Sequence, residues 1–169
     1  ATFGIIRGSA LFVRDLDQAF EPGVAWESIT VGLVPLQQGG LIAPLIAPLT
    51  TARTSTRARP FEVTSEEDVW PIITVQGPLQ SGGKVELTNG WSLHLNRALA
   101  YDQKAVFDTR PGKRTMKLNG RSMNLLAPSG ARLSQLSITP GIHEVALRGT
   151  SLEGTATVKV QWRNVKKVI

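Results

Sequence analysis

Apolar and polar residues alternate with a period of two through much of the second half of the chain. The even-numbered residues from Ala156 to Trp162 are apolar and those between them are polar, and the odd-numbered residues from Trp91 to Leu95 repeat the pattern. Because successive side chains of a strand point to opposite faces, each segment predicts a strand with one buried face. We expect Trp91 and Trp162 in the core and His94 on an outer face.

Turn signals divide residues 61–165 into short strands. Asn-Gly pairs favour the tight turn of a hairpin because both turn residues need a positive φ angle, and Pro-Gly also favours a tight turn. These pairs are Asn89-Gly90, Pro111-Gly112 and Asn119-Gly120. Short strands and turns at regular spacing are typical of an antiparallel β-sandwich. We predict one such domain over 61–165, with strands near 61–64, 72–76, 84–88, 91–96, 104–109, 113–118, 121–126, 142–148 and 155–163.

The chain before residue 61 has two parts. Residues 1–38 predict a short β-rich N-terminal segment, in which Ile29 to Leu33 is β-branched and apolar and forms the best strand. Residues 39–60 predict an extended belt and a polar linker, because Leu-x-x-Pro recurs every four residues and proline suits neither a helix interior nor a central strand. An apolar belt needs a cover, either its own domain or another subunit. The candidate subunit-contact residues are Leu41, Ile42, Pro44, Leu45, Ile46, Pro48 and Leu49.

Charge is distributed unevenly along the chain. The net charge is +6, with two basic and four acidic residues in 1–50 and seventeen basic and nine acidic residues in 51–169. A cationic face can meet an acidic protein, a nucleic acid or an anionic lipid surface, or it can be a solvated sheet face. Specific nucleic-acid binding is not indicated, because aromatic stacking platforms, helix-turn-helix patterns and zinc-finger spacings are missing. The candidate basic contact face consists of Lys104, Arg110, Lys113, Arg114, Lys117 and Arg121.

The sequence does not indicate an enzyme. It contains no cysteine and two histidines, which excludes disulfides, thiolate metal sites and a His-rich metal centre. It also lacks a Gly-x-Ser-x-Gly elbow, a phosphate loop and a dinucleotide fingerprint. We therefore expect no catalytic, cofactor-binding or metal-binding residue and no cofactor. His94 is expected at the surface, His143 as a cap on the turn before its strand, and Glu66 to Asp68 as an acidic turn.

A membrane span is not expected either, because no apolar run reaches the roughly 18 residues that a membrane helix needs.

Several short motifs occur in a fixed order. The belt begins at Gly39-Gly40 and repeats Leu-x-x-Pro, and the chain closes with the Val-x-Trp-Arg strand that ends at Arg163. Between them lie Trp70 to Pro78, Ala105 to Thr115 with the following Leu118-Asn119-Gly120 turn, and Leu136 to Gly141. Together these motifs, across residues 39–163, resemble those of the distal tail proteins of long-tailed bacteriophages, especially actinobacterial ones.

The resemblance implies a fold, an assembly and a location. It implies an all-β chain with a galectin-like or jelly-roll antiparallel sandwich behind the belt and the short N-terminal segment. It also implies a virion structural protein of the tail tip or baseplate hub, made in the host cytoplasm. Such a protein oligomerises with itself, as a hexameric or trimeric ring, and connects the tail tube to other tail-tip, receptor-binding or fibre proteins.

Two other interpretations remain open from the sequence. The main alternative is a carbohydrate-binding module that contributes to adhesion on a host glycan, since sandwiches of this kind bind sugars on one sheet face. The outward candidates are His94, Asn96, Arg97, Lys117 and Gln161. An aromatic platform would come from Trp26 or Trp70, because the other tryptophans are expected in the core. An enzyme or a nucleic-acid binder on the same sandwich is the third interpretation.

Overall fold

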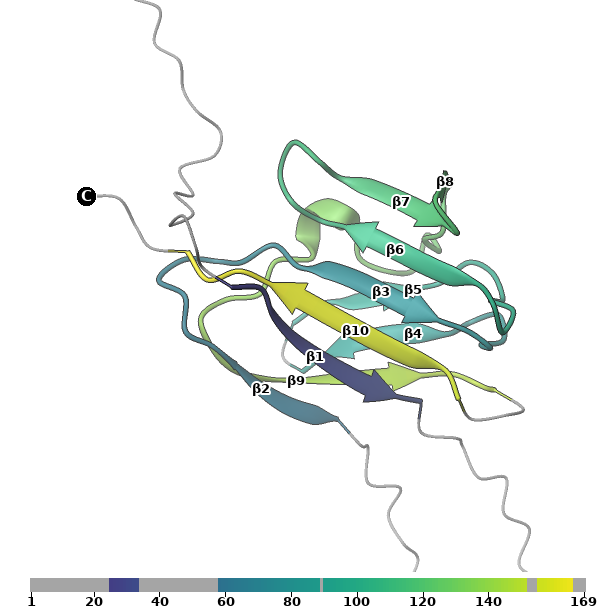
Figure 1. Cartoon of the computed structure of the whole chain (residues 1–169), viewed down its shortest axis with the longest axis horizontal. Coiled ribbons are helices and arrows are strands. Elements are labelled where there is room, and N and C mark those ends of the chain that lie inside the picture. Colours follow the sequence, from purple (N-terminus) through teal and green to yellow (C-terminus); the bar gives the residue numbers. More distant parts are fainter. Residues whose placement is uncertain (1–24, 34–57, 89, 152–154, 166–169) are drawn as a thin grey trace, which may run out of the picture.

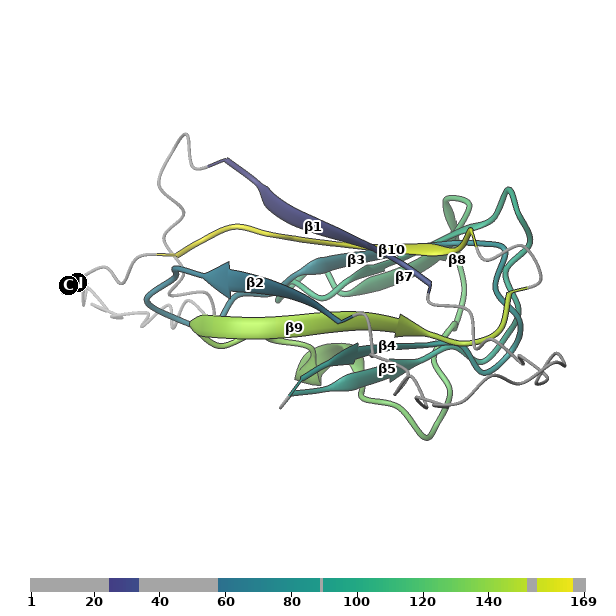
Figure 2. The same cartoon turned by 90° about the horizontal axis from the view of Figure 1, so that it is seen from below.

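The computed structural model describes residues 25–33, 58–88, 90–151 and 155–165 as two antiparallel sheets packed face to face (Figures 1 and 2). The described residues contain no α-helix and only one short 3-10 turn, η1 (Leu133–Gln135). The predicted all-β antiparallel sandwich is therefore confirmed. Its strands are β1 (Glu27–Gly32), β2 (Arg59–Val63), β3 (Ile72–Gln76), β4 (Lys84–Leu87), β5 (Ser92–His94), β6 (Lys104–Asp108), β7 (Thr115–Leu118), β8 (Arg121–Ser122), β9 (Gly141–Arg148) and β10 (Thr157–Trp162).

The larger layer is a six-stranded sheet with the order β1-β10-β3-β6-β7-β8. The strand expected at 29–33 is present as β1, and its residues Glu27 to Gly32 pair with Trp162 to Thr157 of β10. Part of the N-terminal segment thus belongs to the sandwich, which is not restricted to 61–165. Residues 1–24 and 34–57 lie outside the described part of the chain, and with them the whole Leu-x-x-Pro belt.

The smaller layer is a four-stranded sheet with the order β2-β9-β4-β5. A loop lies along β5, where Ala127 and Ala131 donate backbone hydrogen bonds to the carbonyls of His94 and Ser92. This loop pairs with backbone groups that an edge strand would otherwise expose. At the opposite edges of the two sheets, the Arg59 side chain on β2 donates to the Thr30 carbonyl on β1 at 2.9 Å.

The core lies between the two sheets, as the alternation predicts. Trp162 is 3% exposed and Trp91 is 8% exposed. The rings of Phe61 on β2 and Trp162 on β10 are 5.0 Å apart, so this pair joins one sheet to the other. In β9, His143 points inward, 5.9 Å from Phe61, and its Nε2 lies 2.7 Å from the Thr139 carbonyl. The expected cap on the turn is therefore formed by His143.

Several predicted strands are shorter in the structure. The strand expected at 121–126 is reduced to β8, and the strand at 91–96 is reduced to β5, followed by one isolated bridge between Leu95 and Leu126. Beyond Ser122 the chain keeps one more backbone hydrogen bond to β7, from Met123 to the Met116 carbonyl, and then departs from that strand so that Leu125 enters the core. The turn at Asn119-Gly120 has the expected positive φ angles of 46° and 82°.

Candidate interaction surfaces

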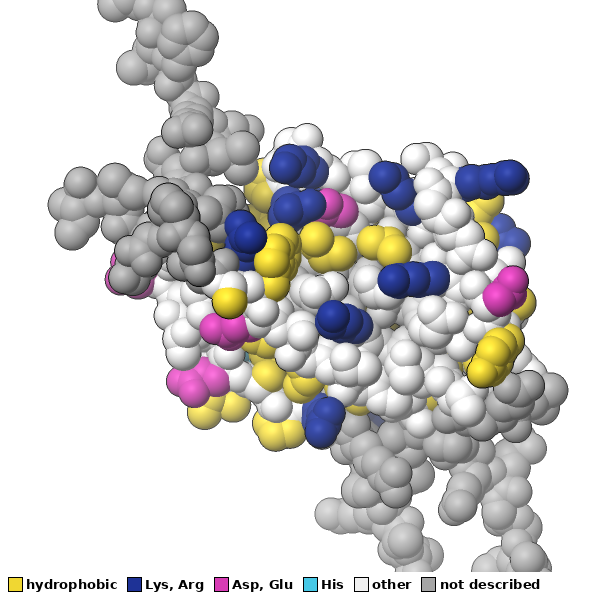
Figure 3. All heavy atoms as spheres, in the orientation of Figure 1, with side chains coloured by type: hydrophobic (Ala, Val, Ile, Leu, Met, Phe, Trp, Pro, Cys, Tyr) yellow, Lys and Arg dark blue, Asp and Glu magenta, His cyan; other side chains and the backbone are white. Residues whose placement is uncertain are grey.

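The outer face of the six-stranded sheet carries lysines with few carboxylates. Lys159, Thr74, Val106 and Lys117 stand opposite one another across β10, β3, β6 and β7. With strands about 4.8 Å apart, this row places the two lysines roughly 14 Å from each other. Neither lysine forms an ion pair within the described residues. Figure 3 shows this face with Lys and Arg side chains spread over it and few acidic ones.

One end of this sheet holds a cluster of arginines and tryptophans. The Arg163 guanidinium lies 4.8 Å from the centre of the Trp26 ring, and the Arg110 guanidinium lies 5.5 Å from the same ring. Arg114 lies 5.3 Å from the Trp70 ring. At these distances a cation is attracted to the ring face. We call Trp26, Trp70, Arg110, Arg114 and Arg163 the arginine–tryptophan cluster.

Strand pairing explains why these residues meet. The pairs Glu27–Trp162, Ile72–Gln161 and Ile72–Asp108 fix the register of β1, β10, β3 and β6. Continued beyond the strand ends, this register places Trp26, Arg163, Trp70 and Arg110 in one row on the outer face. Trp26 is 36% exposed, so the cluster has an apolar surface as well as positive charge.

An ion pair holds one member of the cluster in place. Arg110 donates to both carboxylate oxygens of Asp108, from Nε at 2.9 Å and from Nη2 at 2.6 Å. Partial burial of Asp108 would raise its pKa, but hydrogen bonds from the Arg110 side chain and backbone outweigh burial and lower that pKa. The side-chain hydrogen bonds to Asp108, together with its negative charge, raise the pKa of Arg110 despite its partial burial. Asp108 is thus neutralised by Arg110, and the rest of the cluster keeps its positive charge.

The predicted basic contact face is only partly gathered on one surface. Lys104 and Lys117 point outward from β6 and β7, Arg110 and Arg114 join the cluster, and Lys113 and Arg121 lie in or after the adjacent turns. The predicted basic face did not include Lys159 or Arg163, and it considered Trp26 and Trp70 only as an aromatic platform for a sugar. Strands β1, β3 and β10 bring these four residues to this face from distant parts of the chain.

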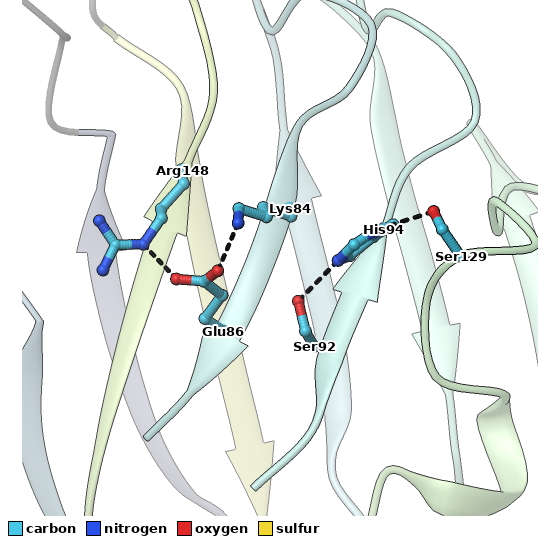
Figure 4. A network of polar contacts seen from close by, with 6 residues as sticks. All are labelled: Lys84, Glu86, Ser92, His94, Ser129 and Arg148. Carbon is cyan, nitrogen blue, oxygen red and sulfur yellow. Dashed lines mark hydrogen bonds and ion pairs between the residues drawn. The ribbon is translucent and has the colours of Figure 1, made fainter. Parts of the chain in front are cut away.

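The outer face of the four-stranded sheet carries a polar network (Figure 4). The Glu86 carboxylate on β4 accepts from Lys84 at 2.6 Å and from Arg148 on β9. Partial burial of Glu86 would raise its pKa, but the hydrogen bonds from Lys84 and Arg148 lower it. His94 lies on the outer face, as predicted, with Nε2 2.9 Å from Ser92 Oγ and Nδ1 3.0 Å from Ser129 Oγ.

A second part of this sheet is acidic and apolar. Ile142 on β9 is 78% exposed and stands opposite Glu62 on β2. Pro60 and Glu144 form the neighbouring outward pair of the same two strands. Glu62 and Glu144 are exposed, and neither takes part in the three ion pairs between described residues. We call Pro60, Glu62, Ile142 and Glu144 the Ile142 patch.

The candidate sugar-binding residues do not converge. His94 lies on the four-stranded sheet, Lys117 and Gln161 lie on the outer face of the six-stranded sheet, and Asn96 and Arg97 are exposed after β5. A depression of about 400 Å³ on the four-stranded sheet is nevertheless lined by polar and aromatic side chains. These include Glu86, Trp91, Ser92, Glu144 and Arg148.

Comparison of the chain with protein-family models, with curated proteins and with solved structures found no match. Within the described ranges, no helix is long and apolar enough to cross a membrane. The same residues contain no group of three or more His, Cys, Asp or Glu side chains arranged to hold a metal ion.

Proposed function

We propose that this chain is a structural component of a bacteriophage tail tip, a distal tail or baseplate hub protein. In this role it assembles with copies of itself into a ring and connects the tail tube to receptor-binding or fibre proteins in the virion. Its work is done by surfaces that bind other proteins, with no chemical step and no cofactor.

The placement of the sequence motifs in the sheet carries this proposal. The motif at Trp70 to Pro78 includes β3, the motif at Ala105 to Thr115 spans β6 and the start of β7, and the closing motif includes β10. These strands are neighbours in the order β10-β3-β6-β7. Motifs far apart in the sequence therefore form one continuous part of one sheet, as segments of a single inherited domain would.

The charged and apolar surfaces also favour an assembling protein. Trp and Arg are enriched in the centres of protein interfaces, and the arginine–tryptophan cluster combines both on one face. An acidic neighbour would complement this face. The Leu-x-x-Pro belt at residues 41–49 is a further proposed contact with a neighbouring subunit.

Negative-stain electron microscopy of the concentrated full chain tests the assembly. We expect class averages of closed rings with a central hole, and sedimentation at several times the 18.3 kDa chain mass. Rotational symmetry in the averages then gives the copy number. A chain that sediments as a monomer at about 100 μM and shows only small isolated particles would contradict the proposed ring.

The depression beside Glu86 makes glycan binding a second candidate function. A carboxylate–arginine pair and a serine hydroxyl can bind the hydroxyl groups of a sugar, although the only aromatic ring among its described lining residues, Trp91, is largely buried. A glycan array followed by Arg148→Ala tests this candidate. Specific binding lost in Arg148→Ala but kept in Lys159→Ala, on the opposite sheet, would support it, and an array without binding would remove it.

A further inference from the structure

Two surfaces on opposite faces of the sandwich have opposite charge and both expose apolar side chains. We propose that the Ile142 patch of one copy binds the arginine–tryptophan cluster of the next copy, in a head-to-tail contact. This inference rests on the proposed self-assembly and names the surfaces that form it.

The arginine–tryptophan cluster has the features of a site for an acidic partner. Asp108 neutralises Arg110, but Arg114 and Arg163 form no ion pair within the described residues. A carboxylate brought by a neighbour would bind these arginines while apolar atoms cover the exposed part of Trp26.

The Ile142 patch has the complementary features. Ile142 is 78% exposed, and contact between an apolar side chain and water is unfavourable. Covering this side chain on association therefore lowers the free energy. Glu62 and Glu144 stand beside Ile142 on β2 and β9 and carry the opposite charge to the cluster. Their carboxylates and the isoleucine side chain can therefore meet the arginines and Trp26 in one contact.

The position of the two patches determines the kind of assembly. One patch faces outward from the four-stranded sheet and the other from the six-stranded sheet, and these sheets form the two outer layers of the sandwich (Figure 2). A copy therefore cannot pair its own patches. A symmetric contact between like patches would oppose like charges, which costs free energy. The contact is heterologous, and such contacts close into rings when the rotation between copies allows it.

Charge reversal tests this contact. The double variant Glu62→Lys and Glu144→Lys makes the Ile142 patch basic, so both surfaces of this copy are basic. The double variant Arg114→Glu and Arg163→Glu makes the arginine–tryptophan cluster acidic, so both surfaces of that copy are acidic. Each variant alone would oppose like charges, so we expect its self-association in sedimentation equilibrium to weaken by at least about tenfold. An equimolar mixture should associate again, because alternating copies then pair opposite charges at every contact.

Single substitutions of exposed apolar residues separate this contact from a general effect of charge. Ile142→Ser should weaken association, whereas Tyr101→Ser, at a side chain that is 68% exposed outside both patches, should not. Circular dichroism melting of every variant checks that the sandwich is folded.

The outcomes distinguish this inference from the proposed function. If the unchanged chain forms rings and both double variants form them equally well, the proposed contact is wrong and the tail-tip proposal still stands. Weakened variants that do not associate when mixed would also overturn the pairing of these two patches. An unchanged chain that stays monomeric would contradict both the contact and the ring.

Discussion

Trp162 shows how far a single residue could be placed from the sequence alone. The alternation from Ala156 to Trp162 predicts an inward side chain, and the structure confirms it with a ring that is 3% exposed. The ring contacts Phe61 at 5.0 Å across the two sheets. The alternation could not predict this partner, because Phe61 lies about a hundred residues earlier and meets Trp162 only when both sheets have formed.

Trp162→Ala should lower the free energy of unfolding by about 3–5 kcal/mol, because it removes a large buried ring and leaves a cavity between the sheets. Urea denaturation followed by circular dichroism measures the loss. The matched control is Tyr101→Ala, at a side chain that is 68% exposed, where we expect a change of about 0.5 kcal/mol or less. Equal losses in the two variants would contradict the packing described for β10.

At the scale of elements, the sequence predicted most strands but not their lengths. The Asn119-Gly120 hairpin and the strands at 72–76 and 104–109 follow from local turn chemistry and alternation, and all three are present. The strand expected at 121–126 ends at Ser122, because strand length depends on which neighbour offers backbone partners. Such partners come from remote segments, so the loop that lies along β5 also had no signal in the sequence.

Gly130 allows that loop to lie against β5. A Cβ atom at position 130 would lie 2.7 Å from the His94 backbone nitrogen, which has little freedom to move. Gly130→Ala should therefore destabilise the protein by about 1–3 kcal/mol and weaken the protection of the Ala127 and Ala131 amides, measured by hydrogen exchange.

Gly32 on β1 provides the control for this substitution. An added Cβ there meets no atom within 4 Å, so Gly32→Ala should leave stability unchanged or raise it slightly. If both alanine variants exchange their amides and melt as the unchanged protein does, the close approach of the loop to β5 is wrong.

At the scale of the whole molecule, the sequence identified the class of fold but not the arrangement of its surfaces. Charge counting found an excess of basic residues in 104–121, yet the face that they form also contains Lys159, Arg163 and two tryptophans from β1, β3 and β10. The exposed Ile142 beside two glutamates likewise depends on the pairing of β2 with β9. Strand order decides which charges share a face, and strand order comes from pairings between residues far apart in the sequence.

The belt gives a whole-molecule prediction that separates folding from assembly. Residues 41–49 lie within the 24-residue connection 34–57, which joins the described segments 25–33 and 58–88. Deleting them shortens this connection to 15 residues, which changes the closure entropy by only about 0.4 kcal/mol. We therefore expect the deletion variant to melt within a few degrees of the full chain.

Self-association of the deletion variant then decides what the belt does. If the belt contacts a neighbouring subunit, sedimentation equilibrium should show weaker association with an unchanged melting temperature. A clear fall in the melting temperature would instead mean that Leu41 to Leu49 packs against its own sandwich. Association at full strength would remove the belt from the subunit contact, and comparison with Ile142→Ser would then show whether the two sheet faces hold the copies together without it.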